Sequence, residues 1–327
     1  MFKLKPHVLI AKAMLVVLSC FVLSFEVVAG EWIVKSGLNV GQVYTDNVDL
    51  EESDKDSELI TVVTPKIDVT GKGRRGNVKA LATFEMNSAG GDADSFSPRI
   101  QAEADAELWE DLLFIEGDIY ANQSLIDPFS KAGNSSLNNN DNVTTTYDYS
   151  ISPYILKHFG RTADLTVRYT YDEQINTGDE LSDSTKQSVL GTLASGDNFS
   201  RIDWTLTTEY QETSFDGGGF MGQDGDNEQF TTSIKLGYQL FRRLNVNGTI
   251  GQESNSFSTA DGDDPDDQFW DIGVRWEPTT RTSIDAGYGK HFYSTNPRFK
   301  FSHRMRKLTF ESSYTRSLTD TRSERRN

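Results

Sequence analysis

The chain has 327 residues, of which 36% are hydrophobic and 25% charged, and its formal net charge is −17. This acidic balance argues against a nucleic-acid partner, because phosphate backbones are bound by basic surfaces. The only cysteine, Cys20, lies near the N-terminus, which excludes disulfides and thiolate metal sites from the rest of the chain.

Residues 1–29 have the composition of a secretory signal peptide. Three lysines precede the apolar run AMLVVLSCFVLSF, and small residues precede Gly30. This order predicts an exported protein that is cleaved after Ala29. A membrane anchor is the alternative, but the apolar run is short for a transmembrane helix.

In the segment PRIQAEADAELWED, residues 98–111, residue propensity and residue pattern predict different structures. Its Ala, Glu and Leu residues favour a helix by propensity. Its pattern, however, places Ile100, Ala102 and Ala104 on every second position, with charged or polar residues between them. A strand gathers such residues on one face, whereas a helix would spread them around its circumference. We therefore expect a strand.

The same alternation recurs along the chain, in about fifteen segments of the length that a tilted strand needs to cross a bilayer, ~9–11 residues. Further examples are 78–86, 113–121, 163–171, 202–210, 230–240, 244–250, 270–276 and 282–288.

Long and short connections take turns between these segments. Long, mostly acidic connections lie near 45–57, 88–95, 124–143, 173–183, 213–227 and 255–267, and short turns lie near 71–76, 109–111, 157–160, 195–198, 241–243 and 277–280. Outer-membrane barrels have this rhythm, with short periplasmic turns and longer external loops. Two aromatic belts are also expected, with Trp32, Trp109, Trp204 and Trp276 near the short turns and Tyr44, Tyr120, Tyr171, Tyr210 and Tyr288 near the long loops.

These features predict an all-β fold: a transmembrane antiparallel up-and-down β-barrel of about 14–16 strands over residues 30–316, followed by a short polar tail, 317–327. A closed barrel satisfies every backbone donor and acceptor in lipid without water. The alternative is a soluble β-sandwich or propeller whose polar face meets water.

Three segments carry a resemblance to a known family: SGLNVGQVYTDNVDL, ELITVVTPKIDVTGKGRRGNVKALATFEMN and YDYSISPYILKHFGRTADLTVRYTYD. They resemble the PEP-CTERM system-associated outer-membrane β-barrel proteins and are similar to the β-barrel porins found with exopolysaccharide loci. The similarity continues to SHRMRKLTFESSYTRSLTDTR. It implies an outer-membrane protein associated with exopolysaccharide export and exosortase sorting. No motif of the family marks a catalytic site, so the resemblance implies no functional residue.

The C-terminal end departs from that family, whose members usually continue for several strands past the position of Arg322. Fifteen strands would also conflict with the even strand number of bacterial single-chain barrels. We expect either a truncated copy that lacks its closing strands or one strand miscounted near 296–310.

Charged side chains between the apolar positions are expected to face the lumen and contact a passenger. Rings of charge select the passenger in other pores. The alternative is that opposite walls pair across a narrow lumen and hold the barrel shut. The candidate residues are Glu103, Asp105, Glu116, Asp118, Arg168, Arg201, Lys235, Arg275, Arg298 and Lys300.

Metal and catalytic sites have weaker support. The acidic run with Asp261, Asp263, Asp264, Asp266 and Asp267 resembles calcium ligands but lacks the EF-hand spacing, so a solvated loop is the simpler interpretation and weak Ca²⁺ or Mg²⁺ binding is the alternative. His291 and His303 are the conceivable bases of a Ser-His-acid site, but no flanking motif supports one. We therefore expect no enzyme activity, no cofactor and no resident metal.

Two functional hypotheses follow. The first is a porin-like protein of the Gram-negative outer membrane that serves exopolysaccharide export, with outer-membrane lipid and lipopolysaccharide around it and extracellular polysaccharide and export machinery as partners. The second is a non-conducting barrel that retains surface polysaccharide or sorted proteins through its acidic loops.

Overall fold

The computed structural model describes residues 30–48, 52–53, 55–88, 95–126, 142–178, 181–216, 227–256, 267–291 and 294–316. The predicted signal peptide, 1–29, and the predicted tail, 317–327, lie outside these residues. None of the described residues belongs to a helix of the length and apolarity that a membrane span requires.

The described part of the chain contains 16 β-strands and no helix. This confirms the prediction of an all-β, antiparallel, up-and-down fold, including a strand over residues 98–109. The region 296–310 contains one short strand and the start of another. The strands are β1 (Glu31–Thr45), β2 (Glu58–Lys72), β3 (Gly76–Ser88), β4 (Ser95–Trp109), β5 (Leu113–Leu125), β6 (Val143–Phe159), β7 (Ala163–Asn176), β8 (Asp183–Ser195), β9 (Ile202–Asp216), β10 (Asn227–Phe241), β11 (Leu244–Asn255), β12 (Asp267–Thr279), β13 (Thr282–His291), β14 (Ser294–Thr295), β15 (Arg298–Arg304) and β16 (Thr309–Tyr314).

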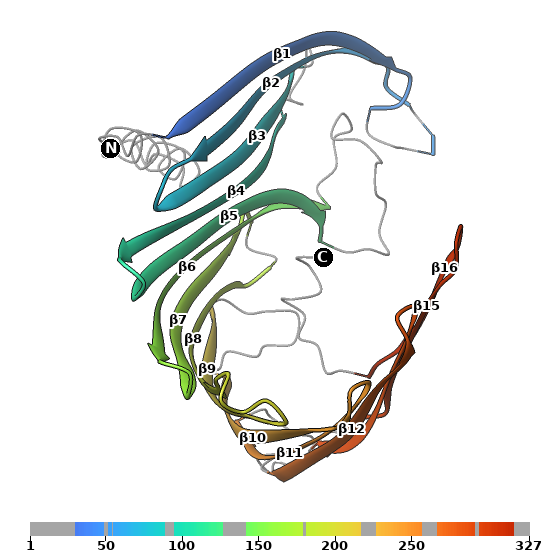
Figure 1. Cartoon of the computed structure of the whole chain (residues 1–327). Helices are drawn as coiled ribbons and strands as arrows, with labels where there is room; N and C mark the ends of the chain where they lie inside the picture. Colours follow the sequence, from blue (N-terminus) through green and yellow to red (C-terminus); the bar gives the residue numbers. More distant parts are fainter. Residues whose placement is uncertain are drawn as a thin grey trace. The chain divides into compact units, whose positions relative to one another are not determined.

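Strand order follows chain order (Figure 1). The two-residue β14 pairs with β13. The predicted short turns join β2 to β3, β4 to β5, β6 to β7, β8 to β9, β10 to β11 and β12 to β13, and the long connections alternate with them. A seventh short turn joins β15 to β16. Because the strands are antiparallel and consecutive, all the short turns lie at the same ends of the strands. We call this end of the sheet the short-turn edge.

The chain forms two compact units. The first contains β1–β5 and the parts of β6–β9 nearest the long connections, and the second contains the remaining parts of β6–β9 together with β10–β16.

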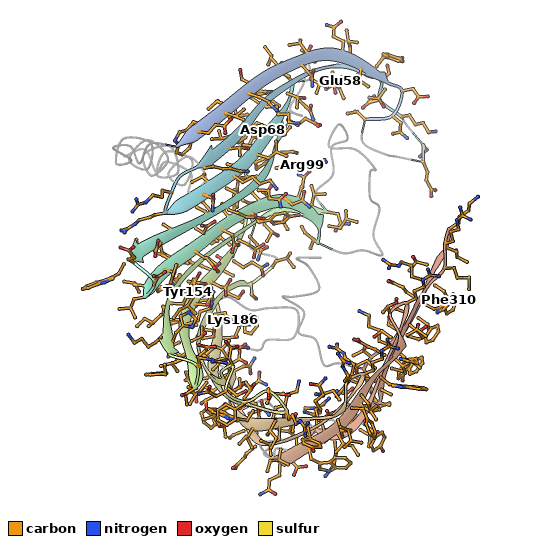
Figure 2. All side chains as sticks on the ribbon, viewed as in Figure 1. Glu58, Asp68, Arg99, Tyr154, Lys186 and Phe310 are labelled. Carbon is orange, nitrogen blue, oxygen red and sulfur yellow. The ribbon has the colours of Figure 1, made fainter. Side chains whose placement is uncertain are left out.

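The strand register sorts side chains onto two faces in each unit. In the second unit Leu206, Ile234 and Ile250 lie in one cross-strand row, and Thr205, Lys235 and Thr249 lie in the next row on the opposite side. We call these sides the apolar face and the polar face. Figure 2 shows side chains projecting from both sides of the ribbon. The period of two read from the sequence thus becomes a two-faced sheet.

One short turn depends on an unusual backbone conformation. Asp111, between β4 and β5, has a φ of 54°. Asp tolerates this left-handed region better than most residues do. Its backbone N–H donates to Glu107 Oε1 at 2.6 Å, which fixes the turn.

Candidate functional site

The polar face of the first unit carries four of the predicted lumen residues. Across β4 and β5 the register places Glu103 opposite Asp118 and Asp105 opposite Glu116. The four carboxylates therefore form one block on the polar face.

This carboxylate block places like charges directly opposite one another, an arrangement that destabilises a sheet. Neutral donors from the neighbouring strands partly offset the repulsion. Asn77 Nδ2 on β3 donates to Asp105 Oδ2 at 3.1 Å, and Ser150 Oγ on β6 donates to Asp118 Oδ1 at 2.7 Å. The register also sets Lys79 opposite Glu103.

The polar face of the second unit has a different character, because opposite charges meet there. Arg298 on β15 donates through Nη1 to Asp271 Oδ2 on β12, and its Nε lies 3.9 Å from Asp285 Oδ1 on β13. Arg275 Nε on β12 lies 3.3 Å from the other oxygen of Asp285. The Arg298 side chain is 32% exposed and the Asp271 side chain 12%. We call these four residues the arginine–aspartate network.

Glycines make room for this network. The register aligns Asn247, Gly273, Gly287 and Arg298 in one row across β11, β12, β13 and β15. A Cβ at Gly287 would lie 2.5 Å from Arg298 Cζ, and one at Gly273 would lie 2.4 Å from Arg298 Nη2. The guanidinium therefore lies over both glycines, and its Nη2 donates to Asn247 Oδ1 at 3.5 Å.

The remaining predicted lumen residues also lie in the second unit. Lys235 shares a polar-face row with Thr249 and Asp271, and Lys300 lies opposite Asp285. The guanidinium carbon of Arg168 on β7 lies 4.0 Å from the centre of the Tyr154 ring on β6, a cation–π contact. Arg201 lies just before β9 rather than within a strand.

The histidines occupy separate environments. His291 stacks on Phe269 with 4.8 Å between ring centres, and its Nδ1 lies 3.6 Å from Glu253 Oε1. His303 Nδ1 lies 2.9 Å from Thr282 Oγ1. The interpretation that either histidine serves as a catalytic base stays a hypothesis.

The predicted calcium-like run lies mostly outside the described residues, which include only Asp267 of its five aspartates. Asp267 is the first residue of β12, before the apolar positions that begin at Trp270. A hydrogen bond from Lys290 Nζ, at 3.2 Å, and a second one from the Gln268 N–H lower the pKa of the Asp267 carboxyl. Among the described residues, no group of His, Cys, Asp and Glu could hold a metal ion.

The apolar face is uncovered in both units. Val34 in the first unit is 65% exposed, and Ile250 and Ile272 in the second are 64% and 58% exposed. Aromatic side chains lie at the ends of this face, including Trp204 and Trp276 near the short turns.

One expected belt residue lies elsewhere. Tyr120 pairs with Gln101 on the polar face of the first unit, so its assignment to the apolar belt was wrong. Strand alternation places it beside Asp118, and its aromatic character does not override that parity.

The alternation therefore located the charged face, but it missed two features. It did not identify the role of the glycines under Arg298, whose signal was the repeated Gly at polar-face positions. It also missed the arginine that immediately precedes β3, β9, β11 and β13.

No protein-family model matches the chain, and no curated protein sequence is similar to it. Among solved structures, the chain is similar to the TodX monoaromatic hydrocarbon channel deltaS2 mutant, with a TM-score of 0.33 and 9% identity over 88% of this chain and 86% of that one. It is also similar to the translocator domain of the autotransporter NalP from Neisseria meningitidis, with a TM-score of 0.24 and 13% identity over 91% of this chain and 96% of that one. At these TM-scores neither likeness carries an assignment of function.

Proposed function

We propose that the strands close into a β-barrel in the outer membrane of a Gram-negative bacterium and that its polar face lines a conduit for extracellular polysaccharide. The observation that carries this proposal is the uncovered apolar face, whose large side chains are exposed in row after row. So much contiguous apolar surface is unfavourable in water. Lipid removes that cost, and closure of the sheet satisfies its edges.

The polar face supports the conduit part of the proposal. It carries Arg, Lys, Asp and Glu side chains that can exchange hydrogen bonds with the hydroxyl and carboxylate groups of a sugar polymer. Such contacts are individually weak and numerous, as passage requires. The resemblance to PEP-CTERM system-associated barrels supports exopolysaccharide export as the setting.

The membrane assignment is tested by a pair of neighbouring substitutions. Ile250→Lys places a charge on the apolar face, and we expect it to reduce insertion into bilayers by about 2–4 kcal/mol if the site lies near the midplane. Thr249→Lys, the matched control, adds the same charge to the polar face and is expected to insert normally. Heat-modifiable migration of refolded protein measures both. Equal insertion of the two variants would contradict a lipid-facing apolar surface.

The conduit is tested by single-channel recording. Residues 30–327, refolded into planar bilayers, are expected to give steady conductance that polysaccharide fragments block. In cells, deletion of the gene is expected to reduce surface polysaccharide, and unchanged export would contradict the assignment.

A second function is favoured by the arginine–aspartate network, which ties β12, β13 and β15 together and leaves those charges satisfied within the wall. A non-conducting barrel would use its acidic long connections to retain surface polysaccharide or sorted proteins. Inserted protein that does not conduct, together with loop deletions that abolish retention but not secretion, would support this function over the conduit.

A further inference from the structure

Three backbone hydrogen bonds between short turns of the second unit and the strands that follow have as acceptor the carbonyl of an arginine directly before a strand; before β7 that position is Thr162. The Gln239 N–H donates to Arg201 O, the Glu277 N–H to Arg243 O and the Arg304 N–H to Arg281 O, each at 2.8 Å. These bonds fix Arg201, Arg243, Arg281 and Arg304 at successive positions along the short-turn edge. We call these four residues the arginine row.

The arginine row continues the polar face. Arg201, Arg243 and Arg281 each immediately precede a strand whose first residue lies on the apolar face, so alternation assigns them to the opposite side. Arg304 pairs with Thr309 in a row of the polar face. The four cations therefore mark the short-turn end of the same surface that carries the arginine–aspartate network.

The charge of the row is not neutralised within the part of the chain that the structure describes. All four arginines are exposed, and none forms an ion pair with a described carboxylate. The guanidinium of Arg243 donates instead to a backbone carbonyl, Pro278 O, at 2.8 Å.

The first unit provides an internal contrast. Arg75 lies just before β3, and its carbonyl accepts the same kind of bond, from the Glu107 N–H at 2.7 Å. Its guanidinium, however, is paired with Glu110 at 3.0 Å and lies 4.0 Å from Glu107. The backbone repeat therefore does not require an unpaired arginine. In the second unit the row adds repulsion between neighbouring cations, most directly between Arg281 and Arg304, a cost that an external anion would relieve.

We propose that the arginine row is the entry site for a polyanionic polysaccharide, one that bears carboxylate groups along its chain. The inference rests on the proposed function and specifies its passenger. Arg201, Arg243 and Arg281 belong to turns two strands apart, about 10 Å, and Arg304 lies on the strand next to Arg281, so the row offers a line of cations to a linear polymer. The guanidinium groups match carboxylates in bidentate geometry.

The position of the row favours a polymer over anionic lipid headgroups. Lipid contacts the apolar face, whereas the row belongs to the polar face and leads toward Arg275 and Lys300. The long connections at the opposite strand ends are acidic in sequence. A polyanion would therefore be attracted at the short-turn edge and repelled at the other end, which promotes release after passage.

The test measures binding by calorimetry with residues 30–327 refolded in neutral detergent micelles. The probes are polygalacturonate oligosaccharides and neutral dextran of matched length. We expect polygalacturonate to bind, dextran not to bind, and the affinity to fall as salt is raised. The variant Arg201→Gln/Arg243→Gln/Arg281→Gln/Arg304→Gln is expected to bind polygalacturonate about tenfold more weakly, since each exposed pair contributes only a fraction of a kcal/mol.

The matched control removes the same charge from exposed cations in or close to the short turns but outside the row. It is Lys157→Gln/Arg242→Gln/Arg306→Gln/Lys307→Gln, which has the same net charge as the row variant but keeps the four arginines of the row. We therefore expect its affinity for polygalacturonate to change less than about twofold. Equal losses in the two variants, or equal binding of dextran, would overturn the proposal. If the quadruple row variant does not refold, Arg281→Gln/Arg304→Gln is compared with Arg306→Gln/Lys307→Gln in the same way.

Two further measurements separate the alternatives. Nanodiscs of neutral lipid and nanodiscs with anionic phosphatidylglycerol are used to compare the row variant with the wild type. Loss of an anionic-lipid preference without loss of polygalacturonate binding would assign the row to lipid and overturn the proposal. Conductance without polygalacturonate binding would overturn this inference but leave the conduit intact. Row-dependent binding by a non-conducting protein would uphold the site while contradicting the conduit.

Discussion

The two units use the same strand alternation, but the polar face of the first sets like charges against each other and that of the second pairs opposite charges. In the first, the carboxylate block sets Glu103 against Asp118 and Asp105 against Glu116, with neutral donors beside them. In the second, Arg298 and Arg275 meet Asp271 and Asp285. Alternation decides which face a charge occupies, whereas the register between strands decides whether its neighbour attracts or repels it.

The largest difference between the units is expected from the loss of Arg298. Arg298→Met removes the cation from Asp271 and Asp285 and leaves the largely buried Asp271 without its partner. We expect the free energy of unfolding to fall by about 2 kcal/mol, less than for a fully buried pair because Arg298 is partly exposed. Urea unfolding of the refolded protein measures it.

The matched control for Arg298 is Arg275→Met, since the Arg275 side chain is 61% exposed. An exposed pair contributes less, and a loss of about 0.5 kcal/mol is expected. Equal losses for the two variants would show that the network is no more than a set of surface charges.

A smaller effect is expected when the space beneath the guanidinium is filled. Gly287→Ala puts a Cβ within 2.5 Å of Arg298 Cζ, so the side chain must move off its partners. We expect a loss of about 1 kcal/mol, as for other overpacked sites. Gly248→Ala is the control, because its nearest atom, Asp271 O, is 3.9 Å from the new Cβ. A similar loss in the control would indicate a general intolerance of alanine in these strands.

The same chemical change is expected to have opposite signs in the two units. Asp105→Asn relieves repulsion with Glu116 and still accepts a hydrogen bond from Asn77, so we expect stabilisation of about 0.5 kcal/mol at low salt. Asp285→Asn removes a charge that faces two arginines and is expected to destabilise the protein. Urea titrations at low and high salt measure both effects, which should shrink as salt increases. Stabilisation by both variants would contradict the inference that Asp105 is repelled by its neighbours and Asp285 attracted by its own.

The smallest effect concerns Asp267, at the polar end of β12. Lys290→Gln removes its main hydrogen-bond partner, so the pKa of Asp267 is expected to rise toward its ordinary value. Because the folded-state pKa is lowered in the wild type, this interaction stabilises the protein above the unfolded-state pKa and is lost as pH falls through the folded-state pKa. Carbon-detected NMR titration of Asp267 provides the measurement, and an unchanged pKa would show that Lys290 is not the cause.

Much of the fold was available from the sequence because a strand's period of two needs only local information. The segment at 98–109 is a strand despite its helical propensity, because its side chains must be divided between an apolar and a polar face. The faces of Glu103, Lys235 and Arg275 follow from the same rule. The contacts of Arg298 could not be predicted, since they depend on the register across four strands. The prediction for Tyr120 was wrong because it followed the residue type, which suggested an aromatic belt. Its position in the strand alternation places it on the polar face.

The hydrogen bonds between successive short turns also bear on how such a chain can change in length. Arg201, Arg243 and Arg281 each accept, through the backbone carbonyl, a hydrogen bond from the next hairpin, and the donor is always a backbone N–H. The bond between hairpins therefore does not depend on the side chain of the donor residue. A whole hairpin could be duplicated or removed, and the flanking turns would still offer a matching donor and acceptor. Such a sheet can grow or shrink in steps of two strands, which preserves the parity of the strand number and the alternation of short and long connections.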